Sequence, residues 1–263
     1  MSNLPPDYAE YPRPSGGPGS GTPYGRGPGV YFDAIGESWG IVTRDLGTWA
    51  AATIVYFAIT WALSLPISLL TQPMATAAQR EAATTGQFGS FLGVFALQFV
   101  LNLIPMSVTA VLHVGMISMA VKKVRGEYVN VGMIFEPFRS FGTIFGSSML
   151  YYLIVFASAL ACVIPSLFFT PVLLLMPVVA YLKQRNPIEA LSLTYDNCKA
   201  HWLGLLGLIV IMGIVAFLGF CACLVGILIT WPMYCVVWGI HYRAFFESSN
   251  SGYAEGPAAY PSA

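Results

Sequence analysis

The chain has 263 residues, of which 56% are hydrophobic and only 9% are charged, and its mean hydropathy is +0.68. Soluble domains carry about a quarter charged residues, so this composition excludes an ordinary soluble globular protein. The net charge is zero and gives no general attraction to nucleic acid, which is therefore not an expected partner.

The first segment of the chain, residues 1–29, holds seven prolines and seven glycines. A stretch of this composition cannot bury enough apolar surface to offset the entropy lost on ordering. The C-terminal residues 247–263 are similarly rich in proline and glycine. We expect two disordered tails on either side of one transmembrane domain, residues 30–246.

Four long stretches between the tails contain no Asp, Glu, Lys or Arg: residues 46–79, 82–121, 140–182 and 200–242. The last two are 43 residues each, enough for two crossings of a bilayer core of about 30 Å at ~1.5 Å rise per residue. The apolar runs do not alternate as barrel strands do. The sequence therefore predicts an all-α membrane protein with six transmembrane helices, at Thr48–Leu70, Ser90–Val121, Gly142–Val163, Pro165–Leu182, Trp202–Ala222 and Leu224–Tyr242.

The second span is too long for one upright crossing and contains Pro105. Two arrangements of residues 88–121 are open: one span kinked at the proline, or a span preceded by a surface helix. The third and fourth spans are expected to meet at Pro165-Ser166, and the last two near Cys223.

A polar stripe runs along the second span, and it is the only marked one in the predicted membrane region. Its members share one helix face and look into the bundle, because polar groups facing lipid are costly; they are Gln98, Asn102, Thr109 and His113. Two interpretations are open: hydrogen bonds that join helices, or the lining of a path for a solute or lipid, with His113 as a group that responds to protons.

An amphipathic segment precedes each pair of spans, with apolar residues three and four apart. The first has Phe32, Ile35, Trp39, Val42, Leu46 and Trp49. The second has Val131, Ile134, Phe138, Phe141 and Phe145. The third has Ile188, Leu191, Tyr195, Cys198 and Trp202, with Asn186 as its predicted N-cap. Such segments are typical of interfacial helices, and the chain is compatible with three repeats of one helix followed by a hairpin.

The positive charges indicate the orientation. Eleven of the twelve Lys and Arg residues fall on one side of the predicted spans, and only Arg80 falls on the other. The positive-inside rule makes the first side cytoplasmic, together with both termini and the interfacial helices. Trp49, Trp202, Trp238 and Tyr242 are then expected in the aromatic belt at the inner boundary.

No residue is assigned a catalytic, cofactor-binding or metal-binding role. Residues 36–40 match the G-x-S-x-G pattern, but that nucleophile elbow needs a strand before it and a helix after it, whereas here it lies in a predicted helix. The five cysteines show no zinc-binding spacing. We expect the protein not to be an enzyme and to need no cofactor.

Two short motifs, Arg125-Gly126-Glu127 and Pro187–Ser192, together with the layout of spans over residues 31–245, resemble a known group of proteins. This is a broad bacterial family of uncharacterised six-span integral membrane proteins, similar to the membrane domain associated with glycerophosphodiester phosphodiesterases. The resemblance implies a location in the bacterial inner membrane and no established activity. The phosphodiesterase activity is not carried over, because that domain needs an early pair of histidines and the first histidine here is His113.

Two functions are compatible with the sequence. The first is a non-enzymatic scaffold or accessory factor in the inner membrane, in contact with membrane lipids and holding cytoplasmic proteins through its tails and interfacial helices. The alternative is a transporter or lipid-handling protein for a neutral or lipid substrate, which uses the polar face of the second span. The absence of charges within the spans disfavours ion pumps and proton relays.

Overall fold

The computed structural model describes residues 28–85, 89–161, 163–221 and 225–247, which are helical with short connections and contain no strand. Five helical segments are long and apolar enough to cross a membrane. They are Leu46–Thr85, Pro105–Val124, Val131–Ser158, Ile164–Leu182 and Pro187–Cys221. The all-α class is thus confirmed for the described residues, and these five segments have the length and apolarity of membrane spans. The predicted tails lie almost wholly outside the described residues.

The helices follow the predicted order. Their bounds are α1 Ala34–Arg44, α2 Leu46–Thr85, α3 Gly89–Val124, η3 Val131–Ser140, α4 Phe141–Ala161, α5 Val163–Leu173, α6 Met176–Leu182, α7 Pro187–Cys198, η4 Lys199–His201, α8 Trp202–Cys221 and α9 Val225–Phe246. The elements labelled η are 3-10 helices. Three hairpins result: α2 with α3, α4 with α5 and α6, and α8 with α9.

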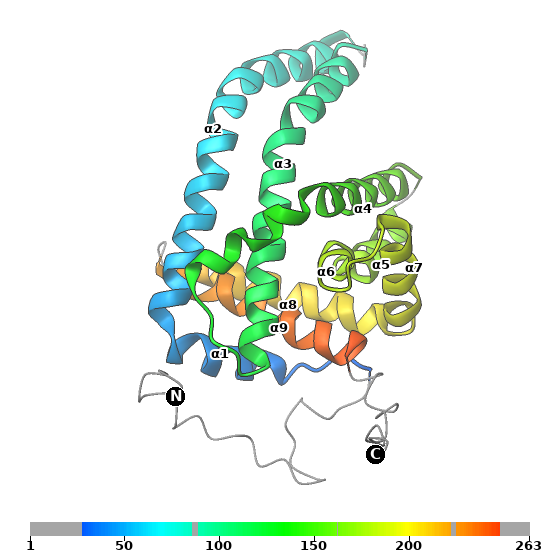
Figure 1. Ribbon diagram of the computed structural model, residues 1–263. Coiled ribbons are helices and arrows are strands. Elements are labelled where there is room, and N and C mark those ends of the chain that lie inside the picture. The colour runs from blue at the N-terminus through cyan, green and yellow to red at the C-terminus, as the bar shows by residue number, and fades with distance from the viewer. Residues whose placement is uncertain (1–27, 86–88, 162, 222–224, 248–263) are drawn as a thin grey trace, which may run out of the picture.

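The first hairpin is longer than predicted. Helix α2 continues past Leu70 to Thr85 and contains Pro66 and Pro73, and its far part bends over the end of α3 (Figure 1). Proline bends a helix because it lacks an N–H and its ring crowds the preceding turn. Helix α3 is one continuous helix through Pro105, so no separate surface helix precedes the second span.

The fourth predicted span is interrupted. It consists of α5 and the short α6, with Leu174-Leu175 between them. Pro177 lies in the first turn of α6, where its missing N–H costs nothing. The predicted turn at Pro165-Ser166 is wrong, because both residues lie inside α5. The turn predicted near Cys223 lies outside the described residues.

The three amphipathic segments that precede the hairpins, here called the lead segments, are α1, η3 and α7. They form helices at the predicted places, but their apolar stripes do not all face the protein. Helix α1 buries Ala34, Ser38 and Val42, and α7 buries Ala190, Thr194 and Cys198. Trp39 of the first stripe is 52% exposed and Ile188 of the third is 75% exposed. Small residues face the bundle because they allow helices to approach closely. The second segment is a 3-10 helix with Pro137 inside. Asn186 is the N-cap of α7, as predicted.

The hairpins are joined in a cyclic order. In each hairpin the first arm is the helix that comes first in the chain (α2, α4 or α8), and the second arm is the part that follows it (α3, α5 with α6, or α9). Each lead segment packs on the second arm of another hairpin: η3 on α3, α7 on α6, and α1 on α9. Each first arm packs on the same neighbouring hairpin as its lead segment, with α4 on α3, α8 on α5 and α2 on α9. The far ends of the hairpins point up, to the right and to the left in Figure 1. The second arms therefore form the centre, and the first arms are largely exposed.

The central core includes residues that the sequence placed in an aromatic belt. Trp49, Trp238 and Tyr242 are buried among other helices, so their rings do not face lipid, whereas Trp202 is half-buried; their depth at the inner boundary stays a prediction. They pack at the end of the bundle where the second arms meet. The physical reason is that this end is filled by other helices rather than by lipid.

Basic side chains bind the carbonyl ends of the central helices. Arg243 Nη1 donates to the Val124 carbonyl at 2.9 Å, and Lys183 Nζ donates to the Phe246 carbonyl at 3.0 Å. These carbonyls lie in the last turns of α3 and α9, where a cation also complements the helix dipole. The second arms are thus tied together at one end of the molecule.

Gly115 on α3 provides a test of the packing of η3. A methyl group at this position would collide with the Ile134 carbonyl oxygen, so we expect Gly115→Ala to lower the free energy of unfolding by about 1–3 kcal/mol. The measurement is the Tm of the purified protein in detergent. Gly213→Ala is the matched control, because nothing lies within 4 Å of its added Cβ, and it should keep or raise the Tm. Equal Tm values for both variants would contradict the close contact.

Candidate functional site

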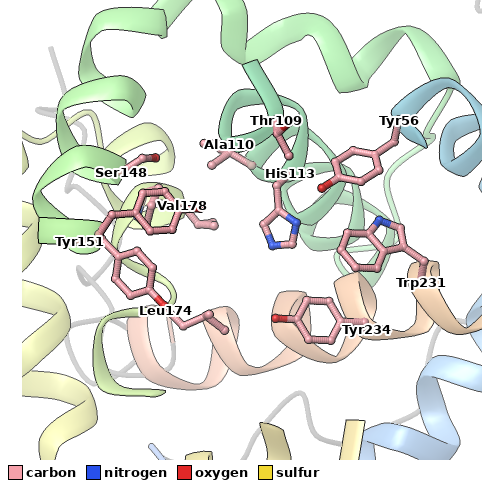
Figure 2. Close-up of a pocket in the computed structure, with 13 residues that line it drawn as sticks. Tyr56, Thr109, Ala110, His113, Ser148, Tyr151, Leu174, Val178, Trp231 and Tyr234 are labelled. Atoms are coloured by element: carbon pink, nitrogen blue, oxygen red, sulfur yellow. The ribbon is translucent and has the colours of Figure 1, made fainter. Parts of the chain in front are cut away.

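A cavity of about 280 Å³ lies between the three hairpins. It receives side chains from α2, α3, α4, α6 and α9 and from the turn before α6, as Figure 2 shows for the labelled residues. The lining residues are Tyr56, Thr109, Ala110, His113, Val114, Ser148, Tyr151, Tyr152, Leu174, Pro177, Val178, Trp231 and Tyr234. The polar groups among them are hydroxyls, one imidazole and one indole N–H, and none is a Lys, Arg, Asp or Glu.

His113 projects from α3 into the centre of an aromatic group. Its ring centroid lies 5.7 Å from that of Trp231 in an edge-on arrangement, and 6.0 Å from that of Tyr234. The Tyr56 ring lies 6.5 Å away on the α2 side. Trp231 and Tyr234 stack at 5.6 Å with an interplanar angle of 17°. Rings from α2 and α9 therefore surround the imidazole and hold it in place.

The opposite wall comes from α4 and carries Ser148, Tyr151 and Tyr152. The two tyrosine rings lie 5.2 Å apart. Figure 2 shows Ser148 and Tyr151 across the cavity from Tyr56 and Trp231. The cavity is thus polar on both sides but uncharged. Such a lining can exchange hydrogen bonds with a neutral ligand and can pack ring faces on its carbon atoms.

The polar stripe predicted on α3 is divided by the structure. Thr109 and His113 line the cavity, whereas Gln98 and Asn102 do not. Asn102 Nδ2 donates to the Gln98 carbonyl of its own helix at 2.7 Å, so this bond joins no second helix. Both side chains are half-buried. Only the half of the stripe on the C-terminal side of Pro105 belongs to the site.

Sequence reasoning missed the partners of Thr109 and His113. Tyr56, Tyr151 and Tyr234 lie well inside charge-free stretches, although tyrosines of membrane proteins gather at the interfaces. Tyrosines so far from the ends of the apolar stretches could have indicated a polar site inside the bundle. No pattern along the chain indicates that helices so far apart place these side chains around one space.

The G-x-S-x-G pattern at residues 36–40 has a structural role. It lies within α1, and the buried Ser38 Oγ donates to the Ile35 carbonyl at 2.7 Å. This hydroxyl is therefore engaged by its own helix and lacks the strand-to-helix turn of a nucleophile elbow. Within the described ranges, no group of three or more His, Cys, Asp or Glu is placed to hold a metal ion.

His241 joins the start of the described chain to α9. Its Nε2 accepts a hydrogen bond from the Tyr31 backbone N–H at 3.1 Å, and its Nδ1 lies 2.8 Å from the Val237 carbonyl. A neutral ring with its proton on Nδ1 satisfies both partners. This buried histidine fixes the position of the segment before α1 and takes no part in the cavity.

Comparison of the chain with protein-family models, with curated proteins and with solved structures gave no match. The chemistry of the cavity is therefore the basis for the functional argument.

The accessibility of the cavity can be tested with single cysteines on α3. In a variant without the five native cysteines, we expect Thr109→Cys to react with a small thiol reagent, because position 109 lines the cavity. Ser118→Cys should stay unreactive, because Ser118 is buried on the same helix and bonded to the Gly115 carbonyl. The measurement is the extent of labelling by mass spectrometry. Equal labelling at both positions would contradict an open cavity at Thr109.

Proposed function

We propose that this protein binds an uncharged small molecule, or the uncharged part of a lipid, in the cavity between its hairpins, and that it transports or handles this ligand without chemical conversion. The observation that carries the proposal is the lining: hydroxyl and aromatic groups from all three hairpins, with no charged side chain. Buried polar groups normally pair with one another, and a polar space among apolar helices needs an occupant that supplies partners.

The absence of charged side chains in the cavity limits the class of ligand to uncharged molecules or groups. An ion or a phosphate group placed there would lose its hydration without gaining a counter-charge, which costs several kcal/mol. A neutral ligand loses less and can be held by hydroxyls and rings. Because each hairpin contributes to the wall, occupancy would also influence how the hairpins lie relative to one another.

We further propose six membrane spans, a bacterial inner-membrane location and cytoplasmic termini. The resemblance of the chain to the six-span bacterial family supports the location. The charged residues support the orientation, because Lys123 pairs with Asp45 at 3.0 Å, Lys122 pairs with Glu136, and Arg125 pairs with Glu247. The first pair joins the start of α2 to the end of α3, and the other two join this end to η3 and to the end of α9. These charged groups therefore lie on one side of the molecule, which the positive-inside rule assigns to the cytoplasm.

A threefold repeat is also part of the proposal. The buried positions Trp49, Ala52 and Tyr56 on α2 have the same spacing as Leu205, Leu208 and Met212 on α8. Ile144, Ser147 and Tyr151 follow this spacing on α4, and the first two are buried. Together with the cyclic packing of the lead segments, this common register supports three copies of one helix-plus-hairpin unit.

A scaffold or accessory role is the second candidate. Trp39 on α1 and Tyr195 on α7 are exposed at corresponding places, one residue after the buried Ser38 and Thr194, and Ile188 is exposed at the start of α7. These apolar faces, with the tails 1–29 and 247–263, offer surfaces to cytoplasmic proteins. The cavity makes ligand binding the first choice, because it gathers uncharged polar side chains from all three hairpins, which a scaffold would not require.

The ligand can be sought by native mass spectrometry of the protein extracted with its own lipids. We expect the wild type to retain a defined neutral ligand and the Thr109→Val, His113→Leu double variant to lose it, because both changes remove polar groups from the cavity. The Gln98→Leu, Asn102→Leu variant is the matched control on the same helix and should retain the ligand. Size-exclusion profiles check that each variant is folded.

Two results would contradict ligand binding in the cavity. One is a wild type that carries only bulk lipid; the other is a folded Thr109→Val, His113→Leu variant that keeps the ligand at the wild-type level. A stoichiometric protein partner in place of a ligand would favour the scaffold role.

The orientation can be tested by cysteine labelling in intact cells. Gln79 lies near the far end of α2 and Arg185 lies beyond α6, and both are exposed. In a variant without native cysteines, we expect an impermeant thiol reagent to label Gln79→Cys and not Arg185→Cys, whereas both should react after the cells are broken. The reverse pattern in intact cells would overturn the proposed orientation.

A further inference from the structure

Ser148 on α4 carries a buried hydroxyl without a hydrogen-bond partner in the described chain. The residue is 3% exposed, and its Oγ is unpaired. The neighbouring Ser147 is also buried, but its Oγ lies 2.9 Å from the Thr143 carbonyl and 3.0 Å from the Ile144 carbonyl of its own helix. An unpaired buried polar group costs about 1–3 kcal/mol. The Ser148 hydroxyl is therefore a buried polar group that makes no hydrogen bond with its own helix.

The unpaired hydroxyl belongs to the cavity. Ser148 is one of its lining residues, and Figure 2 shows its oxygen directed toward the space in front of His113. Trp231, on the opposite wall, has an indole Nε1 that is also buried and unpaired among the described residues. Two unsatisfied donors thus stand on α4 and α9, in different hairpins, with the cavity between them.

We infer that Ser148 receives an uncharged, oxygen-bearing group of the ligand, such as a sugar or polyol hydroxyl, and thereby determines which ligand the cavity selects. This inference rests on the proposed function. A hydroxyl group of a ligand can either accept a hydrogen bond from the Ser148 hydroxyl or donate one to it, so it satisfies the buried oxygen in either direction. The aromatic side chains of Tyr56 and Trp231 also line the cavity and can contact the C–H groups of such a ligand.

The size of the cavity limits what can enter. A cavity of about 280 Å³ suits one sugar-sized group and not a whole lipid. The same chemistry is supplied by a free polyol from water or by the uncharged headgroup of a lipid whose chains stay outside. The inference concerns the shared hydroxylated group, and the test distinguishes the two sources.

The test compares Ser148→Ala with its neighbour Ser147→Ala in protein reconstituted into phosphatidylcholine nanodiscs. Binding of glucose and of octyl glucoside, kept below its micelle-forming concentration, is measured by calorimetric titration; octyl sulfate is the charged control with the same chain. We expect octyl glucoside to bind the wild type and Ser147→Ala alike, and to bind Ser148→Ala about tenfold more weakly, as the loss of one buried hydrogen bond predicts. Ser148→Thr should restore binding because it keeps the hydroxyl.

The outcomes separate the inference from the proposed function. Binding of octyl glucoside alone assigns a membrane source to the ligand, and equal binding of glucose assigns an aqueous one; both support the inference. Undiminished binding to Ser148→Ala, or octyl sulfate binding as strongly as octyl glucoside, overturns it. The ligand-retention experiment with the Thr109→Val, His113→Leu variant is independent of Ser148, so the proposed function can survive that result. Because Ser148→Ala removes no hydrogen bond within the described protein, its unliganded Tm should not fall, and a lower Tm would contradict the unpaired state of Ser148.

Discussion

The close crossing of α3 and α9 is the contact on which the rest of the structure depends. A Cβ added to Gly239 would lie 3.1 Å from both the Ala120 Cβ and the Val121 backbone nitrogen, so the two backbones almost touch. Within lipid, apolar side chains gain little by leaving the solvent, and helices associate through close packing and hydrogen bonds. Because α3 and α9 belong to the first and last hairpins, their crossing completes the cyclic arrangement of the three hairpins and places the second arms at the centre.

The remaining contacts extend this arrangement outward from the centre. Cations at the ends of α6 and α9 bind the last carbonyls of neighbouring arms, and the lead segments lie over those ends. At the other end the hairpins diverge (Figure 1). The cavity lies between these arms and is lined by hydroxyls and rings rather than by charges. Unpaired charges in such a place would cost more than the surrounding packing could offset, whereas neutral polar groups are tolerated and remain available to a ligand.

Much of the fold could be predicted because the bilayer imposes it locally. Charge-free stretches located the hairpins, and Asn186 followed by Pro187 located the start of α7. The errors have one physical cause, namely that side-chain periodicity does not say which neighbour a helix meets. Trp39 and Val42 belong to the same predicted stripe, yet only Val42 is buried, because α1 meets the bundle through small residues. The extension of α2 and the break between α5 and α6 likewise depend on what packs beside them.

The chain alone was enough to predict an all-helical membrane protein, the order of its hairpins and the polar face that carries Thr109 and His113. These features follow from composition and from spacing along one helix. The packing of the helices was needed to show that Gln98 and Asn102 lie apart from the site and that Ser148 belongs to it. The reason is that a cavity between helices is lined by side chains from segments distant in the chain. Whether these segments meet depends on the angle and distance at which the helices pack, and this cannot be read from any single segment.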